Sequence, residues 1–559
     1  MLAAVCAVTI ISALFYFVLK GRQQLAHAFP QPAEQSIIGQ GSSVIAYHPE
    51  AREIGEAILR AGGNAFDAFV ATVAAENVLA EGASSLAGPL GVLIYRAEDN
   101  QVTYLDADFN DPLDPAALWK INDRKLGKSA LVPGAPAGLE AVAKKYGRFA
   151  FSELLQPAIA LAENGFAVNR LMAGFIAHHS KVLKTTKYGR RTFFPKGKPL
   201  AAGEILRQPE LANFLRRLAE EGSAYVYRGD WGERFLSIVE EKGGRLTDKD
   251  LAQYEVNWCV PWTTTYRGYT IHSSSGHSYG GLWVLLALKT LEHTILSTPP
   301  SATHYWQDAD TLERMIRIAR QVWSESDLLD HRVLDNPEIV QSRLTAEYAS
   351  SIWEKVRNRV PPNVMGSKGS HSYHIIVTDS EGNIASGTTT IESEPWAEGM
   401  FVEGVALPSS GKIPWNTEPG RRRLSPFSIH LALQEGQSRF AVGAISNSVV
   451  ETSFQFLVNL IDYQMSVRDS VSTPRFGTFP SQLRRITKKL KLQLDTNWLD
   501  PRVDSSVVKI LKARGIKVTQ KGLIDTGLGT VLRINPEGES EGITAPVPYV
   551  TNPFGHSPK

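Results

Sequence analysis

Residues 366–392, GSKGSHSYHIIVTDSEGNIASGTTTIE, predict a β-hairpin that begins with a hydroxyl side chain. A polar run rich in Gly and Ser ends at Ser372, and β-forming residues follow it. An acidic turn containing Gly and Asn then leads into a second strand, which is rich in Thr. A serine at the junction of a loop and a strand is either a self-cleaving nucleophile or an ordinary strand-start serine. The second interpretation is commoner, so the rest of the chain has to decide between them.

The composition is that of an ordinary globular protein. The 559 residues are 43% hydrophobic and 21% charged, and the chain is long enough for two or more core-sized units. A net charge of +2 gives no reason to expect nucleic acid as a partner. The two cysteines, Cys6 and Cys259, stand in no metal-ligand spacing, and no zinc motif is present. We therefore expect neither a disulfide framework nor a cofactor.

The N-terminus differs in kind from the rest of the chain. Residues 2–19 form a charge-free, mostly apolar run that is followed by Lys20 and Arg22. This run is just long enough to span a bilayer and too long for the apolar core of a typical signal peptide. We expect a membrane anchor at residues 1–20, a linker at residues 21–38, and hence a single-pass membrane protein. The sequence LAHA at 25–28 leaves a cleaved signal, and a secreted protein, as the alternative.

Periodicity predicts layers of helices and hairpins. Apolar residues at helical spacing indicate two helices within residues 51–79 and a mostly helical region over residues 136–218. Strands are expected at 92–95, 102–105, 269–274 and 440–442, with further helices at 282–292, 306–329 and 451–463. Because helices and hairpins are grouped and do not alternate one by one, the pattern predicts an α+β fold.

A second serine competes with Ser372. The sequence GHSYG at 276–280 matches the G-x-S-x-G nucleophile elbow, with a predicted strand before it and a predicted helix after it. Ser278 would then be the nucleophile, with His304 or His331 as its base. An α/β-hydrolase needs alternating strands and helices before the elbow, however, and residues 136–250 are overwhelmingly helical in pattern. A structural Ser/Gly loop is the alternative.

The chain resembles the γ-glutamyltransferase (γ-glutamyltranspeptidase) family of N-terminal-nucleophile (Ntn) hydrolases over residues 38–530. Six blocks in the family's order carry the resemblance: AGGNAFDA at 61–68, SSLAGPLG at 84–91, VPG at 132–134, PAIALAENGF at 157–166, GGRLTDKDLAQYE at 243–255 and SSG at 274–276. The resemblance implies an αββα sandwich of stacked antiparallel sheets, in which residues 39–371 and 372–559 form one catalytic unit. It also implies that the loop around Ser278 holds no nucleophile.

The resemblance assigns the two catalytic positions. Ser372 falls on the family's nucleophilic Thr, and Thr390 falls on the second Thr, which hydrogen-bonds the nucleophile. By similarity, the Ser372 hydroxyl attacks the carbonyl of His371, and the chain splits into two pieces that stay associated. The freed α-amino group can then act as the base for its own hydroxyl. The implied substrates are a small-molecule acyl donor, such as a γ-glutamyl compound, and an amine or water acceptor.

The substrate-binding positions depart from the family. Asp108 stands where the family has the Arg that binds the glutamyl α-carboxylate, and Glu392 replaces an Asn. Ser425 followed by Pro replaces a pair of serines, and Ser446-Asn447 replace the two glycines of the oxyanion hole. Two acids where a carboxylate should bind predict a cationic or neutral group there. We therefore expect a diverged enzyme with an altered acyl or amide substrate; the alternative is an uncleaved, catalytically impaired member that acts as a membrane-anchored binding protein.

Overall fold

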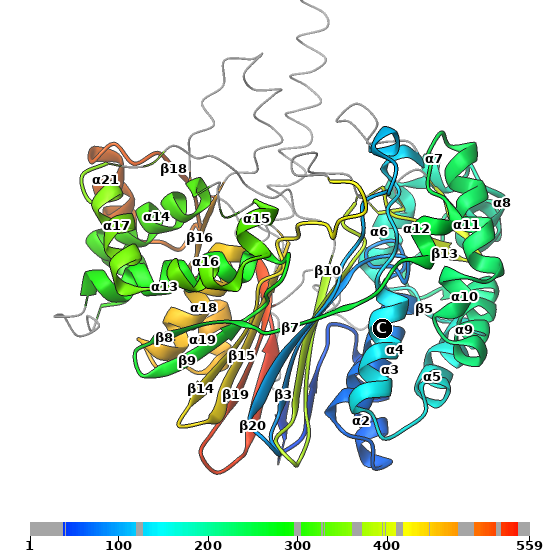
Figure 1. Ribbon diagram of the computed structural model, residues 1–559, viewed down its shortest axis with the longest axis horizontal. Helices are drawn as coiled ribbons and strands as arrows, with labels where there is room; N and C mark the ends of the chain where they lie inside the picture. The colour runs from blue at the N-terminus through cyan, green and yellow to red at the C-terminus, as the bar shows by residue number, and fades with distance from the viewer. Residues whose placement is uncertain are drawn as a thin grey trace, which may run out of the picture.

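The computed structural model describes residues 37–39, 41–118, 127–295, 303–325, 328, 330–359, 361, 372–393, 395–396, 399–409, 418–446, 448–478, 497–520 and 527–545. Two large antiparallel sheets lie face to face at its centre (Figure 1). The six-stranded sheet has the order β2 (Ser43–Ile45), β10 (Ser372–Thr378), β11 (Ile384–Thr390), β3 (Leu90–Arg96), β4 (Gln101–Ala107) and β7 (Asn257–Cys259). The seven-stranded sheet has the order β1 (Ile37–Gly39), β20 (Ser540–Thr544), β19 (Leu528–Ile534), β15 (Gln437–Ile445), β14 (Ile429–Gln434), β9 (Tyr269–Ser273) and β8 (Trp262–Tyr266).

Helices cover the outer face of each sheet (Figure 1). Beside the six-stranded sheet lie α2 (Pro49–Arg60), α3 (Ala65–Leu79), α4 (Ala135–Tyr146), α5 (Phe151–Asn164), α6 (Arg170–His178), α7 (Ser180–Leu183), α8 (Lys187–Phe193), α9 (Pro209–Glu221), α10 (Ala224–Tyr227), α11 (Asp230–Glu241) and α12 (Asp248–Ala252). Beside the seven-stranded sheet lie α13 (Tyr279–Ile295), α14 (Ala309–Ser324), α15 (His331–Leu334), α16 (Pro337–Ser342), α17 (Ala346–Val356), α18 (Val449–Ile461), α19 (Val467–Ser472) and α21 (Ser505–Ala513). The predicted αββα sandwich is confirmed.

Short elements complete the described chain. Three small sheets consist of β5 (Phe166–Ala167) with β6 (Ile205–Leu206), β12 (Phe401–Val402) with β13 (Val405–Ala406), and β16 (Phe476–Thr478) with β17 (Asn497–Leu499) and β18 (Val518–Gln520). Single 3₁₀ turns lie at Pro115–Ala117, Gly127–Ser129 and Tyr305–Gln307.

Side chains from both sheets fill the space between them. Ile376 of β10 and Tyr104 of β4 meet Ile429 and Leu431 of β14 and Ala441 of β15 in one buried cluster. On its other face the six-stranded sheet packs against α3, a 15-residue helix that is buried along its whole length. A helix that is apolar on every side needs neighbours on every side, and α3 has them because it lies between the sheet and helices α2, α4 and α5.

The β10–β11 hairpin contacts α3 through its turn. The Asp379 carboxylate accepts hydrogen bonds from the backbone N–H groups of Glu381 and Asn383 and also from that of Ala65, the first residue of α3. Gly382 has a φ of +87°, which a side chain would disfavour. The acidic Gly-Asn turn therefore sets both the hairpin register and the position of β10 against the helix layer.

The prediction of a single-pass membrane protein is wrong. Among the residues that the structure describes, no helix is long and apolar enough to cross a membrane. The prediction depended on the apolar composition of residues 2–19, which lie outside the described residues. Apolar composition alone does not distinguish a membrane span from other apolar segments: α13 has 17 residues and is largely buried inside the protein.

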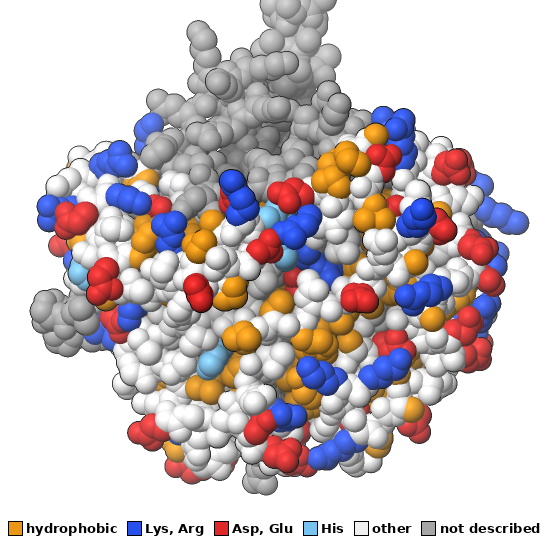
Figure 2. Space-filling view, viewed as in Figure 1, with side chains coloured by type: hydrophobic (Ala, Val, Ile, Leu, Met, Phe, Trp, Pro, Cys, Tyr) orange, Lys and Arg blue, Asp and Glu red, His pale blue; other side chains and the backbone are white. Residues whose placement is uncertain are grey.

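The surface is mixed in charge. On the face shown in Figure 2, Lys and Arg side chains are interspersed with Asp and Glu around the periphery, and hydrophobic side chains gather in the middle. Strand β7 crosses this face (Figure 1), and the next residue, Val260, is 84% exposed. This face has no large patch of a single charge that would attract a polyanion.

Candidate active site

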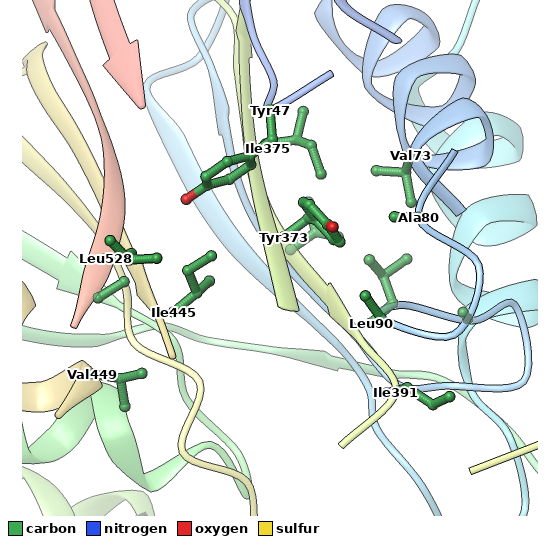
Figure 3. Close-up of a cluster of buried hydrophobic side chains, with 14 of the residues drawn as sticks. Tyr47, Val73, Ala80, Leu90, Tyr373, Ile375, Ile391, Ile445, Val449 and Leu528 are labelled. Atoms are coloured by element: carbon green, nitrogen blue, oxygen red, sulfur yellow. The ribbon is translucent and has the colours of Figure 1, made fainter. Parts of the chain in front are cut away.

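Ser372 is the first residue of β10, and strand alternation fixes where its side chain points. Tyr373 and Ile375 lie on the side of β10 that faces α3, near Val73 and Leu90 (Figure 3). Tyr373 also packs edge-on against Tyr47, with ring centroids 5.4 Å apart. Because successive residues of a strand point to opposite faces, Ser372 points toward the other sheet. The buried Tyr373 side chain thus holds the strand start in place.

Ser372 and Thr390 form a cross-strand pair at the end of the hairpin. They lie opposite each other in the β10–β11 register, and the Ser372 hydroxyl donates a 2.8 Å hydrogen bond to Thr390 Oγ1. The Glu392 backbone N–H donates to the same oxygen at 3.0 Å. Glu392 has a φ of +49°, an uncommon conformation for a residue with a side chain, so the chain turns sharply just after Thr390. The structure therefore brings the two predicted catalytic residues together.

Gly88 packs closely against the carbonyl group of Thr390. A Cβ added to Gly88 would lie 2.0 Å from the Thr390 carbonyl oxygen, so only glycine allows this approach. The Gly88 carbonyl in turn accepts hydrogen bonds from the N–H groups of Gly134 and Ala135, at 3.1 and 2.9 Å. Sequence pattern places Gly88 in a Gly-rich block but does not indicate its contact with Thr390, because the two segments lie far apart in the chain.

Two buried histidines, His374 and His430, lie between the two sheets. His374 is hydrogen-bonded through Nδ1 to Thr388 Oγ1 at 2.8 Å and through Nε2 to Ser386 Oγ at 3.0 Å. Burial lowers its pKa to about 3. His430 of the other sheet is also buried, and burial followed by the charge of His374 lowers its pKa to about 3. Both imidazoles are neutral near pH 7, and the two hydroxyl partners of His374 give it a structural role.

Asp108 lies at the same end of the six-stranded sheet as Ser372 and Thr390. It follows Ala107, the last residue of β4, and is 1% exposed. Its Oδ1 accepts a 2.7 Å hydrogen bond from the Phe109 N–H. Burial and then the negative charges of Glu392 and Asp106 raise the pKa of the Asp108 carboxyl well above its usual range. Asp108 and Glu392, which the sequence analysis assigned to substrate binding, are thus close enough to repel each other.

The Ser278 side chain is hydrogen-bonded to hydroxyl groups and not to a histidine base. It lies between β9 and α13, as predicted, and its Oγ is 2.7 Å from the Tyr104 hydroxyl and 3.3 Å from Ser425 Oγ. The ring of His304 stacks on Trp306, with centroids 4.4 Å apart, and the ring of His331 packs against His277 at 5.1 Å. The G-x-S-x-G loop therefore joins the segment around Ser425 to the six-stranded sheet.

Ser446 keeps a glycine-like backbone. Its φ is +74°, and that of Ser448 is +53°. Both values lie in the left-handed region that disfavours most side chains. The Asn447 assigned to the oxyanion hole lies between them, outside the described residues. A backbone conformation suited to glycine is thus present at the position where the resemblance implies two glycines.

Sequence pattern does not indicate two ionisable residues, His277 and Arg422, that lie near Asp106 and Asp108. His277 lies between Asp106 and Asp335, with nitrogen-to-oxygen distances of 3.7 and 3.3 Å. Arg422 is buried, and its guanidinium donates to the carbonyl oxygen of Asp108 and, at 2.7 Å, to the Tyr254 hydroxyl. Within the described part of the chain, no group of three or more His, Cys, Asp or Glu side chains is arranged to hold a metal ion.

Two stacked antiparallel sheets between helix layers, with a hydroxyl residue opening an inner strand, define the class of Ntn hydrolases. A family model described as gamma-glutamyltranspeptidase matches residues 51–547, and the chain belongs to this family. Its members are self-processing enzymes that hydrolyse or transfer γ-glutamyl or other acyl groups.

Glutathione hydrolases and acylases both match most of the chain. A glutathione hydrolase proenzyme of Bacillus subtilis is 27% identical over 80% of this chain and 82% of its own length. An acylase ACY 1 proenzyme of a Pseudomonas species is also 27% identical, over 90% of this chain and 92% of its own length. The crystal structure of cephalosporin acylase from Bacillus halodurans superposes with a TM-score of 0.77 at 23% identity, covering 93% of this chain and 96% of that one, and so shows the shared fold.

Proposed function

We propose that the chain cleaves itself before Ser372 and then uses the Ser372 hydroxyl as the nucleophile of an acyl transfer or hydrolysis. The observation that carries the proposal is the 2.8 Å hydrogen bond between Ser372 and Thr390 at the open end of an inner strand. A nucleophile has to be accessible to a substrate and oriented by a neighbouring polar group. Ser372 is half-buried, and its hydroxyl is hydrogen-bonded to Thr390.

Self-cleavage is a balanced N-to-O acyl shift. Ser372 Oγ attacks the carbonyl carbon of residue 371, the C–N bond to Ser372 breaks, and the hydroxyl proton passes to the departing nitrogen. Water then hydrolyses the ester, which leaves a carboxylate on residue 371 and a free α-amino group on Ser372. An α-amino group has a pKa near 8 when unperturbed, so part of it is neutral at physiological pH and can take the proton of its own hydroxyl.

The same groups then act on a substrate. Ser372 Oγ attacks the acyl carbon of the donor, the donor's amine leaves with a proton, and an amine or water releases the acyl group from the ester. A backbone N–H of Ser446 or of the next residue in sequence is our candidate for stabilising the oxyanion, and the left-handed φ of Ser446 supports it. Donors are γ-glutamyl compounds or compounds with another acyl group, because the similar proteins include both glutathione hydrolases and acylases.

The two pieces, residues 39–371 and 372–559, stay together after cleavage in this proposal. Strand β10 pairs with β2, and β11 pairs with β3, so the small piece contributes the middle of a sheet whose remaining strands belong to the large piece. Such a sheet cannot come apart without exposing a buried core. No observation favours the alternative of an uncleaved binding protein.

Denaturing electrophoresis of the purified full chain tests the proposal. We expect two bands for the wild type, one full-length band for Ser372→Ala, and two bands for Ser278→Ala. Ser278→Ala is the matched control because it removes a buried hydroxyl next to the site, 1% exposed, without touching the nucleophile. An unprocessed wild-type chain, or processing that Ser372→Ala does not change, refutes the proposal.

A further inference from the structure

Two segments that are far apart in the sequence contact each other at two places near Thr390. At the first place, Gly88 packs against the Thr390 carbonyl group. At the second, the Trp396 indole N–H donates a 3.2 Å hydrogen bond to Oε2 of Glu81. The two contacts close a ring that contains Thr390. A shift of Trp396 therefore has to be taken up within the short segment that leads back to Thr390.

The Trp396 side chain has little freedom to move. It is fully buried, and its ring centroid lies 5.2 Å from that of Phe193 and 6.0 Å from that of His179. A Cβ added to Gly82 would lie 2.3 Å from the indole, so the backbone there packs directly on the ring. The backbone of Trp396 has a left-handed φ of +49°, as does that of Glu392. Such conformations persist only where the surroundings fix them, and the packed indole supplies that constraint.

Glu81 is the polar partner of this indole, and its carboxyl is neutral. The residue is 2% exposed, and among the described residues no group donates a hydrogen bond to its Oε1. Burial raises the pKa of the Glu81 carboxyl to about 8, and the hydrogen bond from Trp396 lowers it by a smaller amount. The carboxyl is therefore mostly protonated at pH 7, which is the form that a buried site without a countercharge can hold.

Among the described residues, no cation offsets a charge on Glu81. The ionisable groups that face this region are the Tyr188 hydroxyl of α8 and the His179 ring, which contacts the indole. Burial and then the charge of Glu81 raise the pKa of the Tyr188 hydroxyl, so both groups disfavour a second buried charge. An ionised Glu81 needs water, and water reaches it only if the packing around the indole opens. The turn after Thr390 is therefore held in place only while Glu81 is neutral.

We propose that Glu81 is a positioning residue, which acts through Trp396 to fix the turn after Thr390. This inference rests on the proposed function, since Thr390 in turn orients Ser372. The Glu392 N–H, which donates to Thr390 Oγ1, lies on that turn. A displaced turn moves this donor and the Thr390 hydroxyl relative to Ser372. A misplacement of about 1 Å in such a group lowers a rate by about 100-fold.

Two tryptophan variants separate positioning from stability. Trp396→Phe keeps a buried ring and removes the donor to Glu81. Trp231→Phe is the matched control, because the Trp231 indole is also buried and donates a 3.3 Å hydrogen bond to the Val402 carbonyl oxygen in β12. We expect the two variants to lower the melting temperature by similar amounts. Trp396→Phe should slow the processing of newly synthesised full chain by about 10- to 100-fold, and Trp231→Phe by less than about threefold.

A pH profile tests the neutral state of Glu81. Glu81→Gln keeps an acceptor for the indole and never ionises, so it should process within about threefold of the wild type at pH 7. At pH 9 about nine-tenths of a carboxyl with a pKa of about 8 is ionised, so the wild type should be about tenfold slower than Glu81→Gln. Glu81→Ala, which removes the acceptor, should be slow at both pH values. Newly synthesised full chain is moved into each buffer, the loss of the full-length band gives the rate, and Ser372→Ala gives the background.

The outcomes keep this inference apart from the proposed function. Equal processing rates for Trp396→Phe and Trp231→Phe overturn the positioning role and leave the nucleophile assignment standing. A wild type that is as fast as Glu81→Gln at pH 9 overturns it as well, and this comparison decides even where Trp396→Phe does not fold. A wild-type chain that stays unprocessed at pH 7 contradicts the proposed function, and the positioning role is then refuted with it.

Discussion

Replacing Gly88 by Ala tests whether the Gly-rich loop positions the catalytic hairpin. The new Cβ would lie 2.0 Å from the Thr390 carbonyl oxygen, and contacts under 3.0 Å essentially never occur, so one of the two segments has to move by about 1 Å. Gly88 has little room to retreat, because its carbonyl accepts two hydrogen bonds at the start of α4. Thr390 therefore takes much of the shift, and its 2.8 Å hydrogen bond from Ser372 is stretched or lost.

The expected consequence is larger for processing than for stability. Overpacking of this kind lowers the free energy of unfolding by about 1–3 kcal/mol. A 1 Å misplacement of a reacting group lowers a rate by about 100-fold. We therefore expect Gly88→Ala to fold and to accumulate as full-length chain, with slow conversion to two pieces.

The assay follows the full-length band over time after synthesis and the melting temperature in parallel. Gly174→Ala is the matched control: Gly174 lies inside α6 with no atom within 4 Å of an added Cβ, so this change should leave processing intact and stabilise the helix by up to about 1 kcal/mol. Processing of Gly88→Ala at the wild-type rate would show that the loop does not position Thr390.

Two further predictions follow from neighbouring contacts. Thr390→Val removes the acceptor of the Ser372 hydroxyl and should slow processing by about 10- to 100-fold. Thr389→Val is the control, because Thr389 lies on the other face of the strand, and it should not slow processing. Equal rates for the two variants would contradict the Ser372–Thr390 pairing. Burial lowers the pKa of His374 and His430 to about 3, against 6.5 for an exposed histidine. As the pH falls from 6.5 toward 3, these two histidines therefore bind protons in the unfolded chain and stay neutral in the folded chain. The free energy of unfolding, measured with urea, should therefore be lower at pH 5 than at pH 7 by about 2 kcal/mol per histidine, and a flat profile would show that the imidazoles are not buried in the neutral form.

Local pattern predicted the elements well. The hairpin, the helix pair before β3 and the strand-turn-helix around Ser278 all lie where periodicity and turn residues placed them. The Ser372–Thr390 pair came from the family resemblance, and the cross-strand register confirms that the two residues lie opposite each other. Alternation along β10 also follows from sequence, since apolar residues there alternate with Ser372 and His374.

Contacts between distant segments could not be predicted from pattern. The approach of Gly88 to Thr390 joins residues about 300 positions apart, and nothing in either segment alone indicates it. The same holds for His374 and His430, whose neutral state depends on packing between two sheets. For the N-terminus the sequence offered only composition, which misled the membrane prediction because an apolar run is not in itself a spanning helix.

The most direct test of the account is the N-terminal sequence of the smaller piece in purified wild-type protein, read by Edman degradation or by intact-mass analysis. We expect one new N-terminus, Ser372 followed by Tyr373 and His374, and a piece that contains residues 372–559. A chain that stays in one piece, or a new N-terminus at any other residue, would contradict the assignment of Ser372 as the nucleophile.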